Sequence, residues 1–252
     1  MKDSYSVTTY SVQNILGLID SGDIAIPEIQ RPFVWDSTKV RDLIDSLYHG
    51  YPTGYLITWK NPDVKIKGGG TAEGKTVLID GQQRITALMA SLAGLSILND
   101  DYESRRIKIA FDPQYDGEDT PFAVLTPVID KNTKWISDIS ELFKPGFNSW
   151  SFVNDYIASN PDCDPSAVNA SITDLLAIAT RQLGCIVINA DCTIDEVTDI
   201  FIRINSKGAV LSQADFAMSK IAADEVHGGS MLRKAIDYYC HLAVKPEFWS
   251  TV

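Results

Sequence analysis

The chain has 252 residues and a mass of 27.8 kDa, which suits one large domain or a core with a smaller subdomain. Hydrophobic residues make up 45% and charged residues 22%, so the chain can bury a substantial core. The net charge is −11; residues 1–110 carry 12 Lys and Arg against 13 Asp and Glu, whereas residues 111–252 carry 10 against 20. This acidic field repels polyanions, which excludes broad electrostatic capture of DNA but leaves room for a local basic pocket in the first half.

The positions of the cysteines, histidines and apolar residues argue against a zinc-binding, a secreted or a membrane protein. The four cysteines form no C-x-x-C pair and the three histidines are scattered, so we expect reduced thiols and no zinc site. The N-terminus is polar and no apolar run approaches 18 residues, so we expect neither a signal peptide nor a membrane span. A cytoplasmic protein without membrane contact is therefore predicted.

The first half of the chain alternates helical and extended patterns. The clearest is a helix that Asp36 or Ser37 can cap and Gly50 ends, since its apolar residues recur at i, i+3, i+4 and i+7 over 40–47. The other expected elements are a helix over 11–20, an extended segment over 24–29, a strand over 55–59 and a hairpin around the triple glycine 68–70.

The stretch from Lys75 to Leu88 (KTVLIDGQQRITAL) stands out for its chemistry. An apolar run at 77–79 predicts a buried strand, and the apolar spacing after Arg84 predicts an amphipathic helix. Gly81 between them can take a positive φ, the first turn of the helix offers free N–H groups, and the Arg84 fork suits a phosphate. Because a GxxxxGK[ST] loop is absent, a phosphate site and a plain turn in which Asp80 only caps the helix both stay open.

The second half is mainly helical. Strands are predicted over 106–111 and 122–125, and a strand over 185–189 is predicted to return to the sheet. Helices are predicted over 135–143, 150–159 and 167–183, from Thr193 to about Gly208 with a capping box at Glu196, from Ser212, and over 231–243. We therefore predict an α/β (α+β) fold: a mixed-sheet core over residues 1–130 and a helical subdomain over residues 131–252.

Four motifs in order carry a family resemblance. They are IPEIQRPFVWD (26–36), YPTGYLITW (51–59), DGQQR (80–84) and FIRINSKGAVLSQADF (201–216). Together they resemble the N-terminal domain of GmrSD-type modification-dependent restriction enzymes, a ParB/sulfiredoxin-like family. The resemblance covers roughly residues 8–225. It implies a ParB/sulfiredoxin-like core that binds, and hydrolyses, a nucleoside triphosphate (NTP) as the regulatory or sensor domain of a prokaryotic anti-phage system.

The predicted catalytic residues lie in DGQQR. Asp80 is suited to hold a hydrated Mg²⁺ or similar divalent cation, or to orient an attacking water. Gln82 or Gln83 could position that water or donate to a phosphate oxygen, and Arg84 could neutralise charge on the transferred phosphoryl group.

Further nucleotide-binding candidates are Gly81, Gln30, Arg31, Arg203 and Asn205. Pro32 restricts Arg31 to extended geometry, which would aim its side chain consistently, and we predict that it binds phosphate while Phe33 and Trp35 join the core. A helix end at Arg203 and Asn205 can be read as a plain C-terminal stop, but the resemblance assigns this motif to the same cleft.

The resemblance also bears on partners. GmrSD-type enzymes cut DNA with an HNH nuclease region, and this chain has no His-Asn-His pattern. We expect it to be a fragment of a longer protein, without nuclease activity of its own, that serves an HNH-type nuclease domain or subunit and reaches DNA through the full-length protein. The alternatives are a non-catalytic, DNA-contacting ParB-like module and a structural scaffold. Which nucleotide is preferred stays open.

Overall fold

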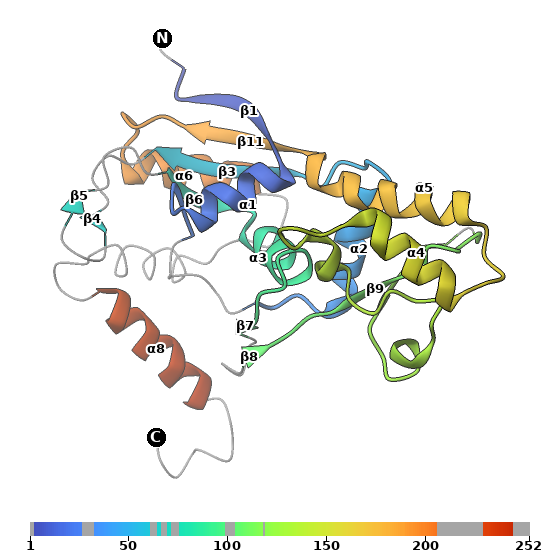
Figure 1. Cartoon of the computed structure of the whole chain (residues 1–252). Coiled ribbons are helices and arrows are strands. Elements are labelled where there is room, and N and C mark those ends of the chain that lie inside the picture. Colours follow the sequence, from blue (N-terminus) through green and yellow to red (C-terminus); the bar gives the residue numbers. More distant parts are fainter. Residues whose placement is uncertain are drawn as a thin grey trace.

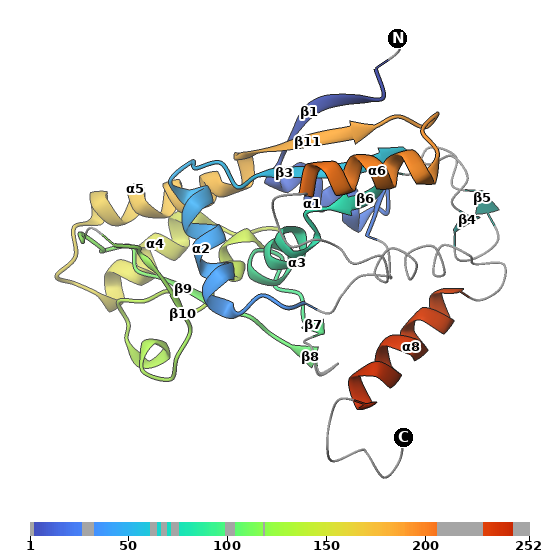
Figure 2. The ribbon, with the colours of Figure 1, turned by 180° about the vertical axis from the view of Figure 1, so that it is seen from behind.

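The computed structural model of the protein describes residues 3–26, 33–60, 65–66, 70–71, 76–98, 104–117, 119–205 and 229–243. Within these ranges the chain forms a mixed five-stranded sheet, three two-stranded sheets and helices on both faces of the large sheet (Figures 1 and 2). The predicted α/β class is confirmed. No helix among the described residues is long and apolar enough to cross a membrane.

The elements follow each other in an order that mixes strands and helices in the first half. The α-helices are α1 (Val12–Asp20), α2 (Ser37–Tyr48), α3 (Gln82–Ser91), α4 (Ser149–Ser159), α5 (Pro165–Leu176), α6 (Ile194–Asn205) and α8 (Gly229–Ala243). Short 3-10 helices are η1 (Ile129–Lys131), η2 (Ile139–Phe143) and η3 (Ala177–Thr180). The strands are β1 (Tyr5–Ser11), β2 (Ile24–Ala25), β3 (Tyr55–Lys60), β4 (Lys65–Ile66), β5 (Gly70–Thr71), β6 (Thr76–Asp80), β7 (Ile97–Leu98), β8 (Ser104–Arg105), β9 (Ile109–Phe111), β10 (Phe122–Val124) and β11 (Gln182–Ile188).

The large sheet has the order β1-β11-β3-β6-β2 (Figure 1). β11 pairs antiparallel with β1 and parallel with β3, while β6 pairs antiparallel with β3 and parallel with β2. The register between β3 and β6 shifts: Ile57 is opposite Asp80, but Thr58 is opposite Leu78, which leaves Ile79 as an extra residue. Such a bulge bends the strand and redirects the residues beside it, here at the end of β6 that carries Asp80.

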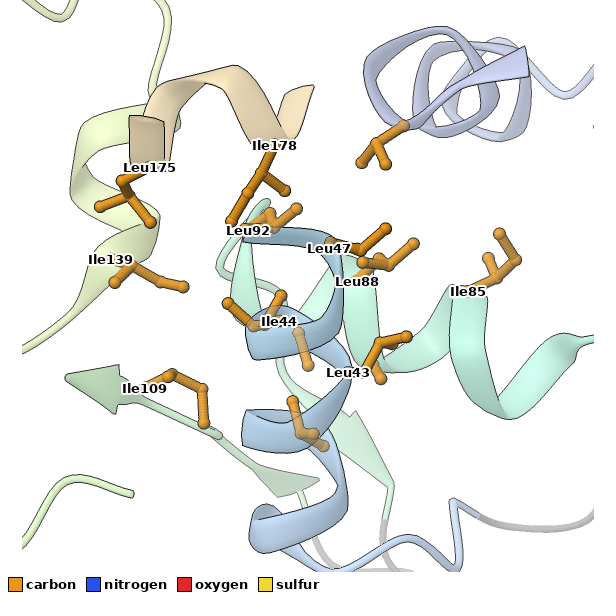
Figure 3. Packing of buried hydrophobic residues seen from close by; sticks show 14 of the residues in the cluster. Leu43, Ile44, Leu47, Ile85, Leu88, Leu92, Ile109, Ile139, Leu175 and Ile178 are labelled. Atoms are coloured by element: carbon orange, nitrogen blue, oxygen red, sulfur yellow. The ribbon is translucent and has the colours of Figure 1, made fainter. Parts of the chain in front are cut away.

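The main core lies on the face of the sheet that α1, α2 and α3 cover. Figure 3 shows Leu43, Ile44 and Leu47 of α2 packed toward Leu88 and neighbouring α3 residues. All are buried, and full burial of one such side chain stabilises the fold by about 1.5–3 kcal/mol. This packing holds α3, and with it the turn that precedes α3, against the sheet.

A second, smaller cluster lies on the other face. Ile57, Trp59 and Ile188 of the sheet pack against Val197 of α6, with Ile200 partly buried beside them. Residues 189–193 connect β11 directly to α6, so the helix runs back over this face of the sheet (Figure 2). A capping box starts α6 as predicted: Glu196 N–H donates to Thr193 Oγ1 (3.3 Å), and Thr193 N–H donates to Glu196 Oε2 (2.7 Å).

Two buried carboxylates form ion pairs between separate segments of residues 106–138. Asp112 is paired with Lys134 Nζ at 2.8 Å, and Asp138 with Arg106 Nη2 at 3.0 Å. The Tyr156 hydroxyl of α4 donates to the Lys134 carbonyl at 2.6 Å. Each buried carboxylate thus has a cationic partner, which offsets the cost of taking its charge out of water.

Several predicted elements differ in detail from the structure. The helix predicted over 135–143 is the 3-10 helix η2 alone, and the strand predicted over 106–111 begins only at Ile109. The helix predicted over 167–183 ends at Leu176, because β11 begins at Gln182 and pairs with Ser11 of β1. The pattern also missed β1. The helix predicted from Ser212 and the predicted helix stop at Gly208 lie outside the described residues.

Candidate functional site

The centre of the candidate site is the turn from β6 into α3. Gly81 connects the two elements with φ 93°, in the left-handed region. A Cβ at this position would collide with Leu56 Cδ2 and would lie 3.3 Å from Arg84 Nη2. Both the backbone angle and the lack of space therefore require glycine here.

The start of α3 carries no side-chain cap. Gly81 is the N-cap residue, and the first backbone bond runs from Ile85 N–H to Gly81 O at 3.0 Å. The N–H groups of the first turn have no carbonyl partner within the helix, and the positive end of the helix dipole lies with them. The alternative in which Asp80 serves only to cap this helix is wrong, because Asp80 makes no capping bond.

Arg84 holds the loop before β3. Its Nη1 donates to Thr53 O at 3.0 Å and its Nη2 donates to Tyr55 O at 2.7 Å, while Nη2 also lies 3.4 Å from Asp80 Oδ2. Gly54 adapts the loop to this contact: its φ is 88°, and a Cβ there would lie 2.9 Å from Arg84 Nη1. The side chain of Arg84 is only 19% exposed.

The environment of Arg84 has opposing effects on its pKa. Burial lowers the pKa of Arg84, and the nearby Asp80 charge raises it, with burial the larger cause. The cation that the sequence suggested as a phosphate ligand is directed at two backbone carbonyls. Sequence reasoning missed this clamp, although the glycine of the YPTGY motif was a signal for a close approach.

The two glutamines make different contacts. Gln82 Nε2 donates to Leu78 O at 3.2 Å, which keeps this side chain at its own turn. Gln83 Oε1 accepts a bond from Val34 N–H at 3.0 Å, so it anchors the segment that precedes α2. Phe33 in that segment is buried, as predicted. Two further candidates, Gln30 and Arg31, lie outside the described residues.

Asp80 is the acidic group of the turn, and its side chain is 35% exposed. Among the described residues no group of three or more His, Cys, Asp or Glu gathers as a metal site. Asp80 could give one carboxylate to a divalent ion, with phosphates and water as further ligands. This donor set fits Mg²⁺, which is usually bound through one or two carboxylates plus substrate phosphates.

Arg203 and Asn205 occupy the last turn of α6. Val197 and Ile200, earlier in the helix, pack with Ile57 and Ile79, the residues beside Asp80 in the sheet. α6 runs back over the sheet from the end of β11. Its last turn therefore extends toward the end of the sheet at which β6 finishes (Figure 2). Arg203 is exposed there.

The fold and this turn define an α/β domain built around a strand–glycine–helix corner with an arginine clamp. The family model of the GmrSD restriction endonuclease N-terminal domain matches residues 12–222, a span that contains all four sequence motifs. The chain therefore belongs to the GmrSD restriction endonuclease N-terminal domain family and forms part of a restriction system. A search of curated proteins found no match.

Proposed function

We propose that this chain is the NTP-binding and NTP-hydrolysing sensor domain of a modification-dependent DNA restriction system. The observation that carries the proposal is the uncapped start of α3 beside the part-exposed carboxylate of Asp80. Helix N-termini of this kind bind phosphate through backbone N–H groups and the dipole. Membership of the GmrSD restriction endonuclease N-terminal domain family supports a nuclease domain or subunit as the partner in this proposal.

In this proposal the residues of the turn have separate tasks. The first-turn N–H groups of α3 bind phosphate oxygens, and Asp80 holds the divalent ion, which would supply positive charge to the phosphates. Gln82 positions the attacking water, because the side-chain oxygen of Gln83 already accepts from Val34. Arg84 keeps the loop at 53–55 in place and puts a fixed positive charge behind the site.

We propose that Gln30, Arg31, Arg203 and Asn205 contribute to the rim of the site. Two described segments support this: β2 runs parallel to β6, and Val34 N–H donates to Gln83 Oε1. Arg203 and Asn205 approach from α6. We propose that this rim adds positive charge and amide donors for the phosphates, consistent with a local basic site in an acidic chain.

The proposed role of the domain is to couple nucleotide turnover to a nuclease domain or subunit. The net charge of −11 gives the chain little attraction for DNA, so the proposal places recognition and cutting of modified DNA with the full-length protein or its partner. Turnover at the turn would set when that nuclease is active.

A thermal-shift titration tests the nucleotide site. Wild type and Asp80→Asn are heated with each NTP, with and without Mg²⁺; a ligand at 100 times its Kd stabilises the fold by about 2.7 kcal/mol. We expect a Mg²⁺-dependent shift in wild type that Asp80→Asn loses. Asp42→Asn, an exposed aspartate paired with Arg41, is the control and should keep the shift. An unshifted wild type with every NTP would contradict the proposal.

A further inference from the structure

Tyr55, the first residue of β3, is exposed, whereas the four residues that follow it in the strand are buried. Its exposed fraction is 57%, whereas Leu56, Ile57, Thr58 and Trp59 are buried. Its carbonyl accepts the 2.7 Å bond from Arg84 Nη2, the same nitrogen that lies 3.4 Å from Asp80. One guanidinium therefore fixes Tyr55 relative to the acidic group of the candidate site.

The ring of Tyr55 is held over a glycine of the neighbouring strand. Gly184 of β11 is in register with Tyr55, and a Cβ on Gly184 would lie 2.7 Å from both Cδ1 and Cε1 of the ring. The ring thus packs against the bare backbone at Gly184 and turns its remaining surface to solvent. A ring already fixed in place loses little conformational freedom when a ligand stacks on it.

The position of Tyr55 in the sheet places it beside the turn. Ile57, two residues further along β3, is the partner of Asp80 in β6. Tyr55 and Ile57 share a face of the sheet because side chains alternate along a strand. That face is the one on which α6 packs. The exposed ring therefore lies within a nucleotide's reach of the start of α3, since two residues of a strand span about 7 Å.

We infer that Tyr55 is the stacking surface for the base of the nucleotide, an inference that rests on the proposed phosphate site at α3. The phosphates occupy the helix N-terminus, and the planar base lies on the open side of the Tyr55 ring. Every base has a π-face, so this contact strengthens binding of all nucleotides. Preference among bases has to come from polar groups around the ring.

Calorimetric titration tests this role by comparing a ligand that carries a base with a phosphate chain that carries none. Wild type, Tyr55→Ala and Tyr55→Phe are titrated in Mg²⁺ with each NTP and with inorganic tripolyphosphate. We expect Tyr55→Ala to weaken NTP binding about 5- to 150-fold, the usual range for loss of one stacked base. Tripolyphosphate affinity should stay unchanged, and Tyr55→Phe, which keeps the ring, should bind NTP as wild type does.

Tyr5→Ala is the matched control. Tyr5 is a strand tyrosine with a similar exposed fraction, 54%, but its partner in β11 is Ile188, whereas Gly184 is paired with Thr9. Its removal should leave both affinities unchanged. Thermal unfolding without ligand shows that each variant is folded.

The remaining outcomes separate this inference from the proposed function. If wild type binds NTP and tripolyphosphate equally well, or Tyr55→Ala binds NTP as wild type does, stacking is refuted while the phosphate site stands. An equal loss for both ligands would assign Tyr55 to the shape of the loop instead. If a single-stranded oligonucleotide binds more tightly than NTP, and Tyr55→Ala weakens that binding, the ligand that stacks on Tyr55 is a nucleic acid and the inference is refuted. If wild type binds neither phosphate ligand, both proposals fall.

Discussion

Arg84 is the residue on which the geometry of the site depends most. Its guanidinium donates to two carbonyls of one loop and contacts the carboxylate at the end of β6, while four-fifths of its side chain is shielded from water. Hydrogen bonds from charged donors contribute about 1.5–3 kcal/mol each, more than neutral ones. Arg84 therefore stabilises the fold as well as the site.

The first prediction follows from this clamp. Arg84→Ala should lower the free energy of unfolding by about 2–4 kcal/mol, because two carbonyls lose a charged donor. Urea denaturation measures it. Arg41→Ala is the control: Arg41 pairs with the exposed Asp42, and such a surface pair contributes about 1 kcal/mol or less. An Arg84→Ala protein as stable as wild type would mean that the guanidinium is a ligand group only.

Gly81 gives a second prediction. Gly81→Ala combines a positive φ with a collision against Leu56, so we expect a loss of about 2 kcal/mol or more in unfolding free energy. Gly17→Ala, in the middle of α1 with no atom within 4 Å of the added Cβ, should instead stabilise the protein by about 0.5–1 kcal/mol. Equal effects at the two glycines would show that the turn tolerates a side chain.

The sequence predicted the turn better than its contacts. An apolar run, a glycine and a helical apolar period suffice to place β6, Gly81 and α3, since these signals are local. The partners of Gln83 and Arg84 are Val34, Thr53 and Tyr55, which lie 29 to 49 residues away, and no local pattern specifies them. The position of each group was predictable, whereas its hydrogen-bond partner was not.

The helices and strands that the sequence pattern predicted wrongly are those whose conformation depends on pairing with a distant strand. β1 carries mostly exposed or half-buried residues, so it lacks the apolar alternation that marks a strand, and its pairing with β11 determines its conformation. The same pairing ends the predicted 167–183 helix early. By contrast, α2 and α6 were predictable because their caps and apolar spacing are local.

Tyr156 of α4 gives a prediction at this scale. It is 7% exposed, and its hydroxyl accepts from Gln114 Nε2 at 2.8 Å and donates to Lys134 O at 2.6 Å. Burial raises the pKa of Tyr156 to about 12 from its ordinary 10.0. Because the unfolded state loses this proton first, the stabilising effect is complete below pH 10 and disappears as the pH rises toward 12.

The measurement is the unfolding free energy of wild type and Tyr156→Phe between pH 9 and pH 12. Wild type should lose stability more steeply with pH than Tyr156→Phe, which has no proton to lose at this position. Tyr156→Phe should also be less stable at neutral pH, since two hydrogen bonds are lost. Parallel pH profiles would contradict the raised pKa.

At the scale of the whole molecule, charge separates the nucleotide-binding proposal from the DNA-module alternative. The chain carries 33 acidic against 22 basic residues, so its overall field opposes DNA. We expect duplex DNA to show no salt-sensitive binding to the isolated chain between about 50 and 200 mM salt in fluorescence anisotropy. Binding that persists without nucleotide and weakens steeply with salt would favour a non-catalytic DNA-contacting module.

In the proposed site, phosphates bind at the start of α3 with a divalent ion on Asp80. A crystal structure of the protein with Mg²⁺ and a non-hydrolysable NTP analogue tests it most directly. We predict phosphate oxygens at the first-turn N–H groups of α3, the ion on Asp80, and Arg84 still bonded to Thr53 and Tyr55. An analogue bound elsewhere, or bound here with Asp80 away from the ion, would contradict it.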